Sequence, residues 1–337
     1  MENMVKFIYY LISKKGEMLL IKYRGIFTAF ILISIILLLA SCTQTEKFYK
    51  KQNIESIITT FEHPETKQKY KIVNAYKLYD NYKDKVEGNP EQSKLEIYKE
   101  EVINPIYSDC FANAEYLYMA DQVLNAAPDR FEEIEKINEK IDSKNTEKII
   151  REALFKSSNL IPSQKVTTIC VLPSTNENTS LLTVGANKIL VQYHESFTDD
   201  YLRIGIAHEY HHSIWAEKYQ SRDKAITVLD NLAFEGKAVM FANLVYPDIH
   251  LPLFDLSLTY NKEDWSKIEG DLDSEDINRS SEILFGGNEL PINYGYSEGY
   301  KMVKSYLDLH PNITPKEWIA LSAKEIFEKG NYIKHYQ

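Results

Sequence analysis

Residues 208–212 read His-Glu-Tyr-His-His and contain the pattern His-Glu-x-x-His. On a helix, side chains four residues apart face the same way, so His208 and His212 can bind one zinc ion. Glu209 follows the first ligand and is placed to act as general base on a water that the zinc activates, which is the chemistry of amide hydrolysis. Only this pair of histidines leaves Glu209 so placed, and we therefore expect His211 to support the site or to lie on the surface. A structural histidine cluster is the alternative.

Two histidines do not complete a catalytic zinc site, which has three protein ligands and one open position. A third histidine in the extended pattern His-Glu-x-x-His-x-x-Gly-x-x-His is excluded, because Ser-Ile-Trp-Ala-Glu-Lys follows His212. Glu235 lies far enough downstream for a helix end, a turn and a return, and a carboxylate among small and apolar residues is costly to bury unless a metal neutralises it. We expect Glu235 to be the third ligand, with Glu217 as its rival and a solvent-facing Glu235 as the alternative.

The motif needs a helix, and the flanking residues predict one. Thr198-Asp199-Asp200 supply an N-cap and an acidic first turn, and the helix is expected to continue to about residue 219. A second helix from about 223 to 245 carries Glu235. Gly236 should let these two helices approach closely.

The rest of the chain predicts helices, a small sheet, and helices again. Apolar and β-branched runs indicate short strands at 165–173 and within 181–194. Helical spacing marks four further segments: 91–127, 130–157, 298–309 and 315–329.

Four segments in this order resemble the bacterial YjaZ-type family of predicted zinc-dependent proteases: HEYHHSIW, Glu235-Gly236-Lys-Ala, Phe285-Gly286 and Tyr296-Ser-Glu-Gly-Tyr300. The resemblance covers about residues 100–330 of the chain. It implies an α+β, zincin-like fold that is mostly helical, with a small sheet preceding the motif helix. The family pattern specifies no substrate beyond a peptide or protein.

The same resemblance assigns roles to the motif residues. It implies a gluzincin-like metallopeptidase in which His208, His212 and Glu235 bind one Zn²⁺ and Glu209 is the catalytic base. Gluzincins of the thermolysin kind carry an aspartate four residues after the ligand glutamate, and Val239 occupies that position here. The residue that orients His208 is therefore unassigned, and Asp230 is a candidate that lies off the face of Glu235.

Two further features could contact a substrate. Tyr296 is the candidate to donate a hydrogen bond to the developing oxyanion, and Tyr300 is the second candidate. Packing is the alternative for both, because the chain has 24 tyrosines. By analogy with zincin-like folds we expect residues 187–193 to form an edge strand that pairs with an extended peptide; a core strand is the alternative.

The N-terminal residues predict a targeting signal rather than a part of the fold. Residues 25–40, GIFTAFILISIILLLA, carry no charge, and Lys22 and Arg24 precede them, as in a signal peptide. Leu39-Ala40-Ser41-Cys42 then resembles the bacterial lipobox, in which Cys42 is lipidated and becomes the mature N-terminus. An uncleaved signal anchor is the alternative, and the sequence leaves open which of the first methionines is the start.

We therefore expect four regions along the chain. They are a lipoprotein signal peptide at 1–41, a polar tether at 42–55, a helical N-terminal region at 56–160 and a zincin-like catalytic region at 161–337, with residues 100–160 packed against the last. The mature protein would be anchored to the cell membrane through the lipid on Cys42, on the extracytoplasmic face.

Composition narrows the partners. The chain has 39 Lys+Arg against 49 Asp+Glu, a formal charge of −10, which argues against a nucleic-acid partner. After cleavage Cys110 and Cys170 remain, outside the reducing cytosol, and the sequence leaves their pairing open. The expected function is a zinc metallopeptidase that hydrolyses peptide bonds at the cell surface. A non-catalytic surface lipoprotein with a structural zinc or a binding role is the alternative.

Overall fold

The computed structural model describes residues 54–178, 180–220, 226–250, 256–287 and 289–337. The contacts divide the chain into two units, Met1–Ser56 and Ile57–Gln337. The predicted signal peptide, Cys42 and nearly all of the predicted tether lie outside the described residues. None of the helices in the described residues combines the length and the apolar character that a membrane span requires.

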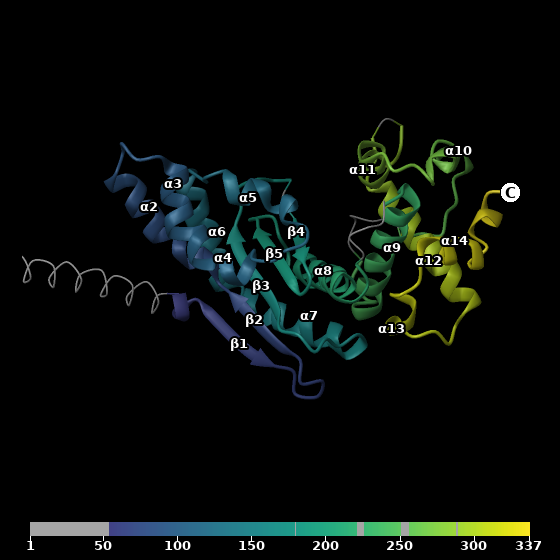
Figure 1. The fold of residues 1–337 in the computed structure, drawn as a ribbon, viewed down its shortest axis with the longest axis horizontal. Helices are drawn as coiled ribbons and strands as arrows, with labels where there is room; N and C mark the ends of the chain where they lie inside the picture. The colour runs from purple at the N-terminus through teal and green to yellow at the C-terminus, as the bar shows by residue number, and fades with distance from the viewer. Residues whose placement is uncertain (1–53, 179, 221–225, 251–255, 288) are drawn as a thin grey trace, which may run out of the picture. The chain divides into compact units, whose positions relative to one another are not determined.

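The centre of the second unit is a five-stranded mixed sheet in the order β1-β2-β3-β5-β4 (Figure 1). Neighbouring pairs are antiparallel at both ends of the sheet and parallel for β2-β3 and β3-β5. The strands are β1 (Ile58–Glu62), β2 (Lys69–Val73), β3 (Thr167–Pro173), β4 (Leu181–Gly185) and β5 (Lys188–Tyr193).

The sheet differs from the sequence prediction in two respects. Residues 56–160, expected to be helical, contribute β1 and β2. These strands are too short to show a periodic signal in the sequence. They join the sheet because β1 pairs with β2 and β2 pairs with β3. The prediction that residues 187–193 form the edge is wrong, because β5 lies between β3 and β4. The apolar run of β5 suits this position, since an interior parallel strand is covered on both faces. The edge strands are β1 and β4, and β4 is the one that packs against α8 (Asp199–Tyr219).

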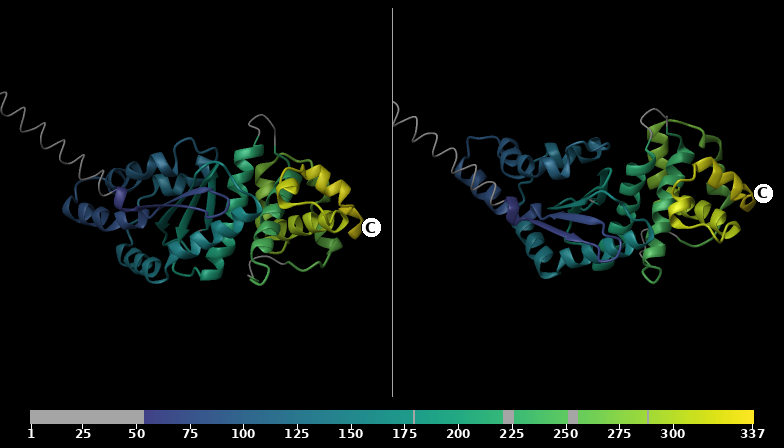
Figure 2. Two further views of the ribbon diagram at one scale, coloured as in Figure 1. Left: turned by 90° about the horizontal axis from the view of Figure 1, so that it is seen from below. Right: turned by 60° about the horizontal axis from the view of Figure 1, so that its bottom comes forward.

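Helices cover both faces of the sheet (Figure 2). Ile169 and Val171 of β3 belong to the core shared with α7 (Thr146–Leu160) and α8 (Asp199–Tyr219). Cys170 and Leu172 belong to the core shared with α2 (Tyr79–Gly88), α3 (Lys94–Tyr98) and α4 (Asn104–Cys110). This alternation follows from the period of two residues in a strand. A disulfide joins Cys110, the last residue of α4, to Cys170, with 6.0 Å between their Cα atoms.

The helices before β3 are shorter than the sequence predicted. The segment 91–127 is interrupted after α4, and the segment 130–157 is divided near Asn145, whose φ is +53°. A left-handed residue cannot continue an α-helix. The helical elements here are α2 (Tyr79–Gly88), α3 (Lys94–Tyr98), a π-helical turn (Lys99–Ile103), α4 (Asn104–Cys110), α5 (Asp121–Asn125), α6 (Phe131–Ser143), α7 (Thr146–Leu160), and the 3-10 turns η1 (Ala75–Leu78) and η3 (Leu117–Ala120).

The helices after β5 form the C-terminal half. The predicted N-cap of α8 is confirmed, because Thr198 Oγ1 accepts a hydrogen bond of 3.0 Å from the Tyr201 N–H. Helix α9 begins at Val228, after a capping box of Thr227 and Asp230 that the sequence analysis missed. The elements are α8 (Asp199–Tyr219), α9 (Val228–Val245), α10 (Lys262–Ser266), α11 (Ile277–Phe285), α12 (Tyr294–Leu309), α13 (Pro315–Trp318), α14 (Ala323–Lys329), and the 3-10 turns η4 (Glu269–Asp271) and η5 (Tyr332–His335). The predicted mixed α+β class is confirmed.

Candidate metal centre

The histidines of the motif lie on the buried side of α8. His208 and His212 are 8% and 5% exposed, and their ring centroids are 4.6 Å apart. Phe234 of α9 stacks on the His212 ring with 4.1 Å between centroids, which fixes the plane of that imidazole. The helical spacing therefore places both rings side by side, as the sequence predicted.

Helix α9 brings Glu235 to these two rings. Glu235 Oε2 lies 3.1 Å from His208 Nε2 and 3.1 Å from His212 Nε2, and the two Nε2 atoms are 3.0 Å apart. Among the described residues, this is the one group of three His, Cys, Asp or Glu side chains found with ligand atoms close enough to hold a metal ion.

The donor set fits zinc. Ligand atoms at about 2.0–2.1 Å from zinc in tetrahedral geometry lie about 3.3 Å from one another, close to the observed triangle. A cation is favoured at a point on which two imidazole nitrogens and a carboxylate oxygen converge, because all three atoms carry lone pairs. With three protein ligands the fourth tetrahedral position is left for water or substrate, which is the arrangement of a catalytic zinc site.

The charges of the cluster are set by mutual contact. Burial raises the pKa of the Glu235 carboxyl, but the neighbouring imidazoles of His212 and His208 outweigh burial and hold it well below its usual range. Burial lowers the pKa of His208, but its hydrogen bond to Glu235 and the charge of Glu209 raise it overall. Glu235 is thus an ionised carboxylate at ordinary pH, as a metal ligand must be.

Glu209 follows His208 on α8, at a position where the helix contacts β4. Burial and the nearby Glu235 carboxylate raise its pKa, and His208 and His212 oppose this change. The main chain at Glu209 is held by β4, because Thr183 Oγ1 donates a hydrogen bond of 2.8 Å to the Glu209 carbonyl. Thr183 was not identified from the sequence, since its role depends on which strand lies beside α8.

Tyr296, at the start of α12, reaches the same site. Its ring centroid is 6.2 Å from that of His208, and burial and the Glu235 and Glu209 carboxylates raise its pKa well above the usual value. Burial and Glu209 also raise the pKa of Tyr201, two turns before His208 on α8. The sequence analysis missed Tyr201, although a position seven residues before His208 is on the same helix face.

A close contact between two glycines positions Tyr296. A Cβ added at Gly236 would lie 2.1 Å from the Gly299 carbonyl carbon, and one added at Gly299 would lie 2.0 Å from the Leu232 carbonyl oxygen. The backbones of α9 and α12 therefore touch, one residue after Glu235 and three residues after Tyr296. We expected Gly236 to serve the approach of α9 to α8, and the structure instead directs it to α12.

The other candidates lie elsewhere. Glu217 Oε2 accepts hydrogen bonds from Ser163 Oγ at 2.6 Å and Asn187 Nδ2 at 2.9 Å, so it connects α8 to the loop after α7 and to the turn between β4 and β5. The Asp230 carboxylate accepts from Thr227 in the cap of α9.

The remaining histidine and tyrosine of the prediction are buried packing residues. His211 lies in the core between Trp318 and Phe241, and burial lowers its pKa well below the usual value. Tyr300 also packs in the core, where burial raises its pKa.

A helix with His-Glu-x-x-His, a glutamate from the next helix and a mixed sheet beside them define a zinc-metalloprotease type of centre. The model of the family described as "Predicted Zn-dependent protease (DUF2268)" matches residues 146–328, more than half of the chain, and the protein belongs to this family. The match runs from the start of α7 into α14 and includes all the residues of the cluster. Comparisons with curated proteins and with solved structures gave no match.

Proposed function

We propose that this protein is a gluzincin-like metallopeptidase of the YjaZ type that binds one Zn²⁺ through His208, His212 and Glu235. The observation that carries the proposal is the convergence of these three ligand atoms beside Glu209. Membership of a family of predicted Zn-dependent proteases supports it.

The residues around the cluster suit peptide hydrolysis. When bound, zinc supplies Lewis acidity that polarises a substrate carbonyl and acidifies a water. Glu209 takes the proton of the attacking water and then delivers it to the leaving amine; burial, which raises its pKa, makes it the stronger base for the first of these steps. Tyr296 is the hydrogen-bond donor to the oxyanion, because its ring lies beside His208 and its phenol is protonated.

The edge strand β4 is the surface on which an extended peptide would pair. The Thr168 N–H of β3 donates a hydrogen bond to the Asn187 carbonyl. From there every second residue of β5 directs its backbone N–H and C=O towards β3, and the residues between them, including Leu190, direct theirs towards β4. Leu182 of β4 lies opposite Leu190, so its backbone groups point inwards, towards β5. Its neighbour Thr183 therefore directs backbone groups outwards, next to Glu209, where a substrate main chain can bind them.

We also propose that Cys42 carries a lipid that anchors the protein on the extracytoplasmic face of the cell membrane. The Cys110–Cys170 disulfide supports this location, because disulfides persist in oxidising compartments. Radiolabelled palmitate incorporated by wild type but not by Cys42→Ala would support the anchor, and equal incorporation by both would contradict it.

The catalytic proposal is tested by Glu209→Gln, which keeps the size of the side chain and removes the base. Zinc content should persist while hydrolysis of casein-derived peptides disappears. The matched control is Glu195→Gln, an exposed carboxylate just before α8, which should retain activity. Undiminished hydrolysis by Glu209→Gln would contradict the role of Glu209.

A further inference from the structure

The outer edge of β4 is closed at one end by a segment from the N-terminal half of the protein. The Tyr116 N–H donates a hydrogen bond of 2.9 Å to the Val184 carbonyl, and the Ala186 N–H donates one of 2.8 Å to Glu115 Oε2. A Cβ at Gly185 would lie 2.4 Å from that same carboxylate oxygen, so Glu115 packs directly on the strand. We name Glu115-Tyr116 the closing segment.

Strand β4 and helix α8 run in the same direction, which allows positions along them to be compared. Thr183 Oγ1 donates to the Glu209 carbonyl at 2.8 Å. Further along both elements, the Asn187 N–H in the turn after β4 donates to the Ser213 carbonyl at 3.3 Å. The strand and the helix therefore lie side by side and run in the same direction.

The closed point is one residue from the strand position that contacts the motif helix. Thr183 binds the main chain of Glu209, and the carbonyl of the next residue, Val184, is bound by Tyr116. A peptide paired with β4 beside Glu209 therefore meets the closing segment one residue after Thr183.

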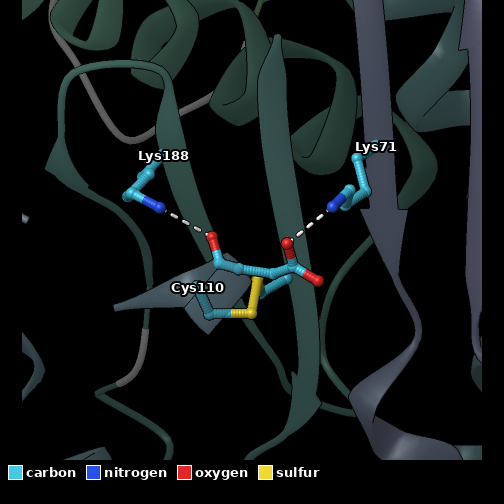
Figure 3. The surroundings of a disulfide bond; sticks show 5 residues. Lys71, Cys110 and Lys188 are labelled. Carbon is cyan, nitrogen blue, oxygen red and sulfur yellow. Dashed lines mark hydrogen bonds and ion pairs between the residues drawn. A yellow bond between two sulfur atoms is a disulfide. The ribbon is translucent and has the colours of Figure 1, made fainter. Parts of the chain in front are cut away.

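The closing segment is firmly attached. Cys110, five residues before Glu115, is joined by the disulfide to Cys170 of β3 (Figure 3). Beside it, Lys188 Nζ donates to the Asp109 carbonyl at 2.7 Å and Lys71 Nζ pairs with the Asp109 carboxylate at 2.6 Å. The end of α4, five residues before Glu115, is thus tied to β2, β3 and β5.

Antiparallel pairing is the more stable arrangement of two strands. In that arrangement the residues that precede the scissile bond extend towards Val184, and those that follow it extend towards Leu181. Glu115 places a carboxylate at the closed end, where it would attract the ammonium group of a free peptide N-terminus.

We infer that the closing segment Glu115-Tyr116 limits the substrate to peptides cleaved near a free N-terminus, with one or two residues before the scissile bond. This inference rests on the proposed peptidase function and specifies its substrate class. It assigns to Glu115 and Tyr116, which lie outside the zinc motif, the role of specificity-determining residues.

The test is to incubate the zinc-loaded full chain with a mixture of synthetic peptides of varied sequence and to locate each cut by mass spectrometry. Cuts in the first two bonds should be at least about tenfold more frequent than cuts at interior bonds, since interior cleavage requires at least one buried backbone pair to be broken. Evenly distributed cuts would overturn the inference and leave the peptidase function intact. Absence of any cut, or cuts that persist in Glu209→Gln, would contradict the proposed function itself and the inference with it.

Two variants separate the closing segment from other causes of such a preference. Tyr116→Pro removes the N–H that binds Val184 and should shift cuts towards interior bonds, and Glu115→Gln should reduce the preference for free over acetylated N-termini. The control is Tyr118→Ala, an exposed side chain of η3, which should keep the wild-type pattern. If Tyr116→Pro does not fold, Glu115→Gln decides: an unchanged preference for free N-termini would overturn the role of Glu115.

Discussion

The contact between Gly236 and Gly299 gives the sharpest prediction about the construction of the site. In Gly299→Ala the new methyl carbon would lie 2.0 Å from the Leu232 carbonyl oxygen, whereas ordinary van der Waals contacts begin at 3.4 Å. The obstacle is the backbone of α9, which cannot rotate away as a side chain can. Helices α9 and α12 must therefore separate by on the order of 1 Å.

This separation should affect stability and catalysis together. Overpacking of a close helix contact costs about 2 kcal/mol, which corresponds to a fall in Tm of about 5 °C for a domain of this size. A displacement of about 1 Å between Tyr296 on α12 and Glu235 on α9 should lower kcat by about 100-fold. Gly236→Ala should behave in the same way, because its methyl would lie 2.1 Å from the Gly299 carbonyl carbon.

The assay compares thermal unfolding, zinc content and peptide hydrolysis of these variants with Gly270→Ala. A Cβ at Gly270 meets no atom within 4 Å, so that variant controls for the loss of glycine flexibility. If Gly299→Ala matches Gly270→Ala in Tm and kcat, the contact does not position the site. A lower Tm with unchanged kcat would show that the contact serves stability alone.

Three further predictions follow from single contacts. Replacing Cys110 and Cys170 together by serine should lower the free energy of unfolding, measured in urea melts, by up to about 4 kcal/mol. This is the value that chain entropy gives for a separation of 60 residues. A loss below about 1 kcal/mol would contradict a stabilising role of the disulfide. Burial raises the pKa of Tyr98 to about 12, so its contribution to stability is present below pH 10 and is lost as pH rises towards 12, by up to about 3 kcal/mol. Between pH 8 and pH 11 the Tyr98→Phe variant should therefore lose less stability than the wild type. An equal loss in both proteins would refute this cause. Thr183→Val should lower the free energy of unfolding by about 1 kcal/mol and should lower kcat, because the hydrogen bond to the Glu209 carbonyl disappears. Thr183→Ser keeps the hydroxyl and should restore both stability and kcat. Failure of serine to do so would assign the effect to packing.

The elements that could be predicted are those with a local signal. The N-cap at Thr198 marks the start of α8, and the i, i+4 spacing of His208 and His212 determines that their rings share a face. The strands β3 and β5 are β-branched and apolar, and they were located to within two residues. The structure also brings Glu235 to the two histidines, which the cost of an unpaired buried carboxylate had suggested.

What could not be predicted depends on contacts between segments distant in the chain. No local pattern states that β5 pairs with β3 and leaves β4 at the edge, or that Tyr116 binds Val184. Gly236 is visible in the sequence as a site of close approach, but its partner Gly299 is set by the packing of α12. The short strands β1 and β2 become stable only when the sheet is complete.

The central claim is that His208, His212 and Glu235 form one zinc site, and metal stoichiometry tests it most directly. Purified full-length protein, dialysed against metal-free buffer and measured by inductively coupled plasma mass spectrometry, should contain about one zinc per chain, since three protein ligands form a complete catalytic site. Glu235→Ala should reduce the zinc content sharply, while Glu217→Ala, on α8 but away from the cluster, should not. A wild-type protein without stoichiometric zinc, or equal zinc content in wild type and Glu235→Ala, would contradict the account.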